Sequence, residues 1–291
     1  MIQDKVIGTD LDGTLFYPKR RIRLLSSGNK AFINRFLNDG GRLLIVSSRS
    51  DFMSQKVALA HHHNLDTVCC NGSFVICNNQ IIKETFFDTA YLKALLADLR
   101  KQFDPPLILL TSKDRNLVMT RTKVSHITNF GYFLYNFFQG VYKEPFVRSD
   151  HIFAQEIEKG KVYKMMVMIG VSKKSKAQAM EINRALREKY PGAEFSWIGE
   201  FIEITPKGCS KSSGIAFYLD YNHISRDNVI VVGDSGNDIS MFEAYPENSY
   251  CMAHGNDHVQ RHAKHIIKRF SDLESVLYPS EDSNLPKKEV K

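Results

Sequence analysis

Short apolar runs and amphipathic stretches alternate over the N-terminal part of the chain. Residues 5–9 are apolar and prone to β structure, and residues 42–47 (RLLIVS) form a continuous apolar run between turn residues, which is typical of a strand covered on both faces. Residues 27–38 carry apolar side chains at helical spacing, and residues 51–63 also favour a helix. A third apolar run spans residues 67–70. This β-α-β-α-β order predicts a doubly wound parallel sheet.

The pattern changes after the third run. Two β-prone runs within residues 73–84 flank Asn78-Asn79, which is the signature of a hairpin. From residue 85 to residue 205 the regular alternation is lost, so we expect a separate α+β domain there. Helical patterns lie at 90–102 and 176–190, strand patterns at 107–111, 117–121 and 162–171, and a further hairpin pattern at 194–205.

The first pattern resumes after Pro206. Helical patterns lie at 209–221, 238–244 and 258–265, and strand patterns at 228–232 and 250–253. The simplest organisation is an α/β, Rossmann-like parallel-sheet core that is interrupted by an inserted α+β domain. The predicted units are a discontinuous core at 1–84 and 206–278, the inserted domain at 85–205, and a flexible polar tail at 279–291.

The amino-acid composition limits the classes of protein to which the chain can belong. The 291 residues are 43% hydrophobic, which is enough for a packed core. We expect no membrane partner, because the chain has no run of about 18 apolar residues. Because the first residues also lack the apolar run of a signal peptide, we expect a cytoplasmic protein. The five cysteines include no C-x-x-C pair, which argues against a disulfide framework and a zinc site.

The charge balance favours an anionic ligand. The chain has 39 basic and 32 acidic residues, which gives a net charge of +7. The basic residues are spread along the chain rather than gathered in one stripe, so we expect no nucleic-acid partner. A protein that binds small anionic molecules shows the same bias.

Two aspartates, Asp10 and Asp12, follow the first predicted strand in the sequence GTDLDGTL. Two like charges about 4 Å apart repel by roughly 4 kcal/mol at an effective dielectric constant near 20, so a positive partner is needed. Parallel strands carry their ligands at their carboxyl ends. Polar residues follow three further strands and converge on the same edge, namely Ser47, Ser48 and Arg49, then Asn71 and Gly72, and finally the GDSGND stretch at 233–238.

This convergence predicts a metal site. Carboxylate oxygens from Asp10, Asp12, Asp234 and Asp238 in one crevice require a hard cation, and oxygen ligation suits Mg²⁺. Lys211, near the start of a predicted helix, adds a second positive charge. A phosphate held between the metal, the lysine and helix N-termini fits this collection. For Arg49 two interpretations stay open, a contact with substrate or an ion pair with a core acid.

These motifs together resemble the haloacid dehalogenase (HAD) superfamily of phosphotransferases. The similarity rests on DLDGT at 10–14, the hydroxyl of Ser47, Lys211 and GDSGND at 233–238, and it extends to NGS at 71–73 and EITPKGCSK at 203–211. The place of the insert resembles the C2-capped branch, the Cof-type phosphatases. The family commonly has Thr-Gly-Arg where this chain has Ser47-Ser48-Arg49.

The resemblance implies a role for each motif residue. Asp10 would be the nucleophile that forms an aspartyl-phosphate, and Asp12 would be the general acid and base. Mg²⁺ would bind the Asp10 carboxylate, the Asp12 main-chain carbonyl and Asp234, with Asp238 in or near its coordination shell. The remaining assignments are Ser47, Lys211, Gly13 and Asn237 as phosphate-binding residues, and Ser48, Arg49, Asn71 and Gly72 as substrate-binding residues.

The implied activity is Mg²⁺-dependent hydrolysis of a small phosphorylated metabolite, such as a sugar phosphate. A phosphomutase and a nucleotide or flavin phosphate phosphatase are alternatives on the same core. A phosphometabolite-binding protein without turnover is a third alternative. The sequence leaves the physiological substrate and the oligomeric state open.

Overall fold

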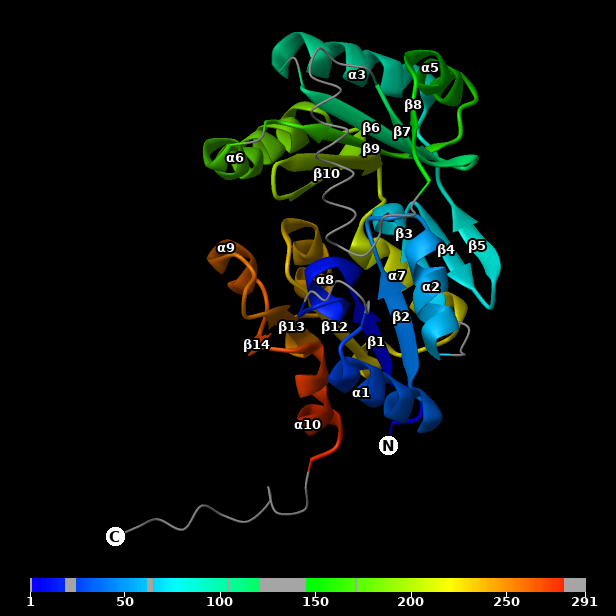
Figure 1. The fold of residues 1–291 in the computed structure, drawn as a ribbon, viewed down its shortest axis with the longest axis vertical. Helices are drawn as coiled ribbons and strands as arrows, with labels where there is room; N and C mark the ends of the chain where they lie inside the picture. Colours follow the sequence, from blue (N-terminus) through cyan, green and yellow to red (C-terminus); the bar gives the residue numbers. More distant parts are fainter. Residues whose placement is uncertain are drawn as a thin grey trace.

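The computed structural model describes residues 2–18, 25–61, 65–103, 105–120, 145–170 and 172–279 and contains two β-sheets, one above the other in Figure 1. Apart from residue 279, the predicted tail lies outside the described residues. The boundaries predicted for the core and the inserted domain stay a prediction.

The lower sheet, here called the core sheet, confirms the predicted parallel α/β core. Its strand order is β14-β13-β12-β1-β2-β3-β4-β5. The first six strands in this order are parallel to one another, whereas β4 and β5 form an antiparallel hairpin at one edge. The strands are β1 (Val6–Thr9), β2 (Arg42–Val46), β3 (Asp66–Cys69), β4 (Phe74–Cys77), β5 (Gln80–Glu84), β12 (Val229–Gly233), β13 (Ser249–Met252) and β14 (His265–Ile267).

Helices cover both faces of the core sheet (Figure 1), because alternate residues of its strands point to opposite faces. Ile7 of β1 packs with α1, whereas Val6 packs with α7. Both side chains are completely buried. The covering helices are α1 (Ser27–Asn38), α2 (Phe52–His61) and α10 (Leu273–Leu277) on the face of Ile7, and α7 (Lys211–Tyr221) and α8 (Ile239–Ala244) on the face of Val6.

The upper sheet, here called the cap sheet, has the strand order β10-β11-β9-β6-β7-β8. Its helices pack on one face over a shared apolar core. The strands are β6 (Leu107–Ser112), β7 (Arg115–Met119), β8 (Val147–Arg148), β9 (Val162–Met168), β10 (Ala193–Ile198) and β11 (Phe201–Pro206). The helices are α3 (Thr89–Phe103), α5 (Asp150–Glu158) and α6 (Lys173–Lys189).

Five elements differ from the sequence-based expectation: one expected helix is much shorter, and the sequence patterns did not predict α5, α10, β8 and β14. The helix expected at 258–265 is only the short α9 (Asp257–Gln260), because the residues after it turn into β14 and pair with β13. The helix α5 was not expected. Its start is marked by Ser149, whose side chain accepts a hydrogen bond from the backbone N–H of Ile152, so a capping signal was present in the sequence.

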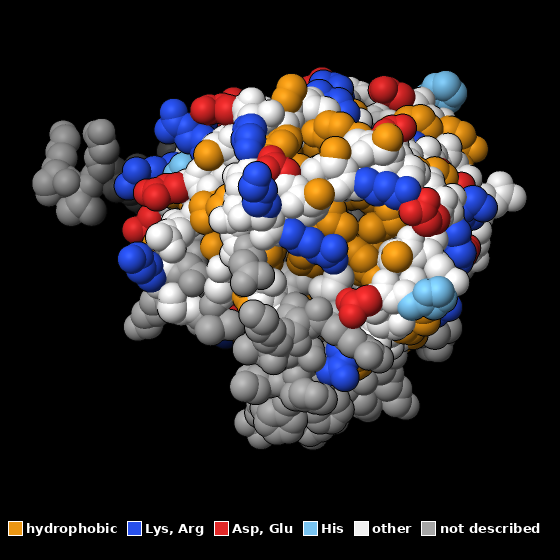
Figure 2. Space-filling model, turned by 90° about the horizontal axis from the view of Figure 1, so that it is seen from above, with side chains coloured by type: hydrophobic (Ala, Val, Ile, Leu, Met, Phe, Trp, Pro, Cys, Tyr) orange, Lys and Arg blue, Asp and Glu red, His pale blue; other side chains and the backbone are white. Residues whose placement is uncertain are grey.

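The structure also bears on the cysteines, on membrane-spanning helices and on the surface charge. All five cysteines are buried, and each has a free thiol. Within the described residues, no helix is long and apolar enough to cross a membrane. Figure 2 shows the α3 and α5 end of the molecule, where Lys and Arg side chains lie scattered among acidic and hydrophobic ones instead of forming one stripe.

Candidate active site

The central strand β1 delivers Asp10 to the edge of the core sheet. The backbone N–H of Asp10 donates to the Val232 carbonyl at 3.0 Å, which continues the pairing of β1 with β12. Residues 11–15 then form a tight turn in which Gly13 has a φ of +86°. A Cβ atom at Gly13 would lie 2.4 Å from an oxygen of Asp234. Only glycine therefore lets the turn approach the loop after β12 this closely.

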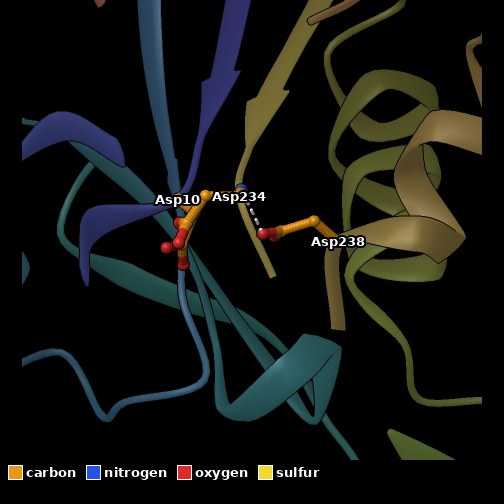
Figure 3. Close-up of side chains that lie close together, drawn as sticks. All are labelled: Asp10, Asp234 and Asp238. Carbon is orange, nitrogen blue, oxygen red and sulfur yellow. Dashed lines mark hydrogen bonds between the residues drawn. The ribbon is translucent and has the colours of Figure 1, made fainter. Parts of the chain in front are cut away.

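The loop after β12 supplies Asp234 and Asp238 (Figure 3). Asp234 accepts hydrogen bonds from Thr14 Oγ1 at 2.9 Å and from Ser235 Oγ at 3.2 Å. Asp238 Oδ2 accepts from the backbone N–H groups of Asp234 at 2.8 Å and of Ser235 at 2.9 Å. The carboxylate of Asp238 thus holds its own loop in shape.

Lys211 is the positive partner that the acidic residues require. It is the first residue of α7, behind the capping residue Ser210. Its Nζ lies 2.7 Å from Asp10 Oδ1 and 2.6 Å from Asp238 Oδ1, and its side chain is completely buried. Burial opposes the charge on this amine, but the two carboxylates outweigh it and raise the pKa of Lys211. Lys211 therefore stays protonated.

One ammonium does not balance the surrounding carboxylates. Burial raises the pKa of Asp10 well above its usual value. The neighbouring carboxylates raise this pKa further, and Lys211 opposes them. Burial and the nearby Asp238 raise the pKa of Asp234 to about 7. The site is therefore short of positive charge.

The donor set fits a divalent cation. One carboxylate oxygen from each of Asp10, Asp234 and Asp238 lies within 4.8 Å of the others. With Lys211 charged, three ionised carboxylates leave a formal charge of −2, which one Mg²⁺ would neutralise. Asp238 accepts hydrogen bonds from the Lys211 ammonium and from two backbone N–H groups, which are fixed donors, whereas Asp234 accepts from the hydroxyls of Thr14 and Ser235, whose hydrogens can rotate away. Asp10 and Asp234 are therefore better suited as direct ligands, with Asp238 holding Lys211 beside them.

Asp12 lies in the same turn but has a different partner. Arg49 Nε donates to Asp12 Oδ2 at 2.6 Å, and Arg49 Nη2 donates to Asp12 Oδ1 at 3.3 Å. This bidentate pair joins the loops after β1 and β2. The structure contains an ion pair between Arg49 and an acid, Asp12, while the interpretation of Arg49 as a substrate contact stays a prediction. The side chain of Asp12 does not belong to the carboxylate cluster.

The loop after β2 places Ser47 and Ser48 beside this pair. Ser47 is buried, and its hydroxyl accepts a hydrogen bond from the backbone N–H of Arg49 at 3.1 Å. Ser48 does not have a positive φ. This position therefore does not require the glycine that is common in the family. The carbonyl of Ser48 accepts from Lys164 Nζ at 2.5 Å.

The loop after β3 brings Asn71 and Gly72 to the start of α7. Asn71 and Gly72 have φ values of +51° and +89°. A Cβ at Gly72 would lie 2.2 Å from the carbonyl oxygen of Ser210, immediately before Lys211. Asn71 Nδ2 donates to Glu203 Oε2 at 2.8 Å, and Asn237 Nδ2 donates to the same oxygen at 2.9 Å.

The sequence reasoning missed two residues at this edge, Glu203 on β11 and Lys164 on β9. Glu203 opens the EITPKGCSK stretch, so its place in a motif was visible while its contacts were not. Lys164 carried no motif signal. Every residue predicted for the site lies on the loops at this one edge of the core sheet or at the start of α7.

Comparisons with known proteins agree with this geometry. Residues 7–278 match the family of haloacid dehalogenase-like hydrolases. An uncharacterised protein from Mycoplasma capricolum subsp. capricolum is 24% identical over 280 residues, which are 92% of this chain and 98% of that protein. A solved structure from Streptococcus mutans UA159 has a TM-score of 0.75 at 20% identity and covers 92% of this chain and 94% of its own. A solved HAD subclass IIB sugar phosphatase has a TM-score of 0.73 at 17% identity, with 94% and 98% of the chains covered.

Proposed function

The chain belongs to the haloacid dehalogenase-like hydrolases, and on this premise we propose that it is a Mg²⁺-dependent phosphatase acting on small phosphorylated metabolites. Sugar phosphates are the leading candidates. The observation that carries this proposal is the placement of Lys211 between Asp10 and Asp238, with Asp234 alongside. Two buried carboxylates with raised pKa values, Asp10 and Asp234, beside one ammonium are typical of a functional site.

Asp10 is the nucleophile in the proposed first step. A carboxylate oxygen of Asp10 attacks the phosphorus, the bond from phosphorus to the leaving oxygen breaks, and Asp12 gives that oxygen a proton. The alcohol leaves and an aspartyl-phosphate remains. In the second step Asp12 takes a proton from a water molecule whose oxygen attacks the phosphorus. Inorganic phosphate leaves, and the Asp10 carboxylate is restored.

The other residues hold the phosphoryl group and the acid. Lys211 and Ser47 would bind the phosphoryl oxygens, and the turn at Gly13 would present backbone N–H groups to them. Through its bidentate contact Arg49 would orient the ionised form of Asp12, which acts as the base in the second step. Mg²⁺, held by Asp10 and Asp234, would act as a Lewis acid that offsets the negative charge of the transferring group.

The proposed substrate class follows from proteins of the same fold. A protein with the same fold is a sugar phosphatase, and another, from Bacteroides thetaiotaomicron, is a phosphatase of the same superfamily. These likenesses favour phosphate esters of small metabolites. We further propose that residues 85–205 act as a cap that excludes water and selects the leaving group.

The test is release of inorganic phosphate from a panel of sugar, nucleotide and flavin phosphates. We expect free phosphate from at least one ester in the presence of Mg²⁺, loss of activity after EDTA treatment, and recovery when Mg²⁺ is added back. Isomerised sugar phosphate without free phosphate would indicate a phosphomutase instead. Binding of the esters without turnover would identify a phosphometabolite-binding protein, and full activity in metal-free buffer would remove the cation from the proposal.

A further inference from the structure

A buried polar cluster joins the two sheets beside the catalytic loops. Lys164 on β9 and Glu203 on β11 form its ion pair, with Lys164 Nζ 3.0 Å from Glu203 Oε1. Their side chains are only 4% and 0% exposed. Asn71 and Asn237, which complete the cluster from the core loops, are also buried. The cluster is thus part of the interior and not a solvated surface pair.

The ion pair ties together three loops of the core sheet. Glu203 Oε2 accepts from Asn71 Nδ2 in the loop after β3 and from Asn237 Nδ2 in the loop after β12. Lys164 Nζ also donates to the carbonyl of Ser48 in the loop after β2. Each of these loops carries a residue that we assign to substrate or phosphate binding. A movement of β9 and β11 would therefore act on all three loops at once.

The register of the cap sheet places the two charges together. Ile202 and Ile204 point into the apolar core under the helices, so Glu203 between them points to the opposite face. Glu203 is directly opposite Met166 in the pairing of β11 with β9. Lys164, two residues from Met166, is its diagonal neighbour on the same face.

Stability alone does not explain this arrangement. Burial would raise the pKa of Glu203, but Lys164 and the two amides lower it to about 2, so the carboxylate stays charged. The carbonyl oxygens of the same two side chains, Asn71 Oδ1 and Asn237 Oδ1, are buried without a hydrogen-bond partner among the described residues. Unpaired buried acceptors are unfavourable, and a buried ion pair is often no more stable than apolar residues of the same size.

We propose that Glu203 and Lys164 are positioning residues, which hold the three core loops in their working geometry. The substrate site is then complete only when the cap sheet is docked on the core sheet. The carboxylate and the ammonium act on the reaction through the two asparagines and the Ser48 carbonyl. This inference rests on the proposed phosphatase function.

The experiment compares Glu203→Gln with Glu156→Gln. Glu156 is a matched control, because it is also buried, accepts hydrogen bonds from Ser112, Arg115 and Lys159, and lies on α5 at the far end of the cap sheet (Figure 1). With Mg²⁺ and p-nitrophenyl phosphate, we expect kcat/KM to fall about 10- to 100-fold in Glu203→Gln. In Glu156→Gln we expect kcat/KM per folded molecule to stay at the wild-type value even if the melting temperature falls.

Hydrogen exchange supplies a readout that is independent of turnover. Amides at residues 70–72 and 235–238 should exchange faster in Glu203→Gln than in the wild type and in Glu156→Gln. If Glu203→Gln does not fold, Glu203→Asp replaces it, because Asp keeps the charge near Lys164 but is too short to reach both asparagines. Wild-type kcat/KM and exchange in the folded Glu203 variant would overturn the inference. A wild-type protein that hydrolyses no ester would overturn the proposed function first.

Discussion

At the scale of single residues, the site depends on one buried cation. Lys211 contacts both Asp10 and Asp238, and the carboxylates exceed it in number. The raised pKa of Asp10 is the consequence, since burial and the neighbouring acids both disfavour its charge. Removing that charge should therefore relieve repulsion, while it removes the proposed nucleophile.

The variant Asp10→Asn tests this directly. The amide keeps the volume of the carboxylate, so we expect a melting temperature equal to or above that of the wild type. Phosphate release should fall at least about 1,000-fold, because an amide cannot form the acyl-phosphate. Asp114→Asn, a change at an exposed carboxylate paired with Lys159, is the control and should keep full activity. Unchanged hydrolysis in Asp10→Asn would refute the assignment of the nucleophile.

At the scale of elements, the start of α7 is set by its contact with the turn at residues 70–72. Gly72 has a positive φ and leaves no room for a Cβ beside the Ser210 carbonyl. Ser210 caps the helix that begins with Lys211. The close approach of α7 to the turn at residues 70–72 therefore fixes the position of the Lys211 ammonium.

Substitution of Gly72 by alanine should be costly for two reasons. The positive φ costs roughly 1 kcal/mol for a residue with a Cβ, and the clash with the Ser210 backbone forces α7 to shift. We expect Gly72→Ala to lower both the free energy of unfolding, by about 2 kcal/mol or more, and kcat. Gly199→Ala is the matched control, because Gly199 also has a positive φ but a Cβ there meets nothing within 4 Å. Equal losses of stability in the two variants, measured by urea unfolding, would exclude the close approach as the cause.

Periodic patterns predicted most of these elements. The strand β2 is a continuous apolar run and α1 an amphipathic repeat, so both were expected close to their observed bounds. The hairpins β4-β5 and β10-β11 were predicted from their turn residues, Asn78-Asn79 and Gly199 respectively. The short β14 was missed, because a strand of three residues at the edge of a sheet carries no measurable period and forms only by pairing with β13.

The candidate site could be predicted where it follows from parallel topology. Asp10 and Asp234 come after neighbouring strands, so the rule for carboxyl ends brings them together. The partners of Asn71 and Asn237 could not be found this way. Alternation tells which face of β11 carries Glu203, but only the docking of one sheet on the other decides which loops it meets.

At the scale of the whole molecule, the proposed metal links protonation to folding. The pKa of Asp234 is about 7 in the folded protein and near 3.8 when unfolded, so without metal the folded state binds more protons between pH 4 and pH 7. Stability contributed by this group is therefore lost as pH rises through that range, by up to about 1.4 kcal/mol per pH unit. The raised pKa of Asp10 acts in the same direction.

Addition of Mg²⁺ should reverse this loss. The cation has to displace the proton of Asp234, so it should bind weakly at pH 5.5 and tightly at pH 8. Because a ligand of the folded state raises stability by mass action, we expect Mg²⁺ to raise the melting temperature more at pH 8 than at pH 5.5. In Asp234→Asn, which removes one ligand charge and the titrating proton, the increase at pH 8 should be largely lost. Scanning calorimetry with and without Mg²⁺ measures both proteins, and an equal increase at the two pH values in the wild type would contradict the coupling between Asp234 and the cation.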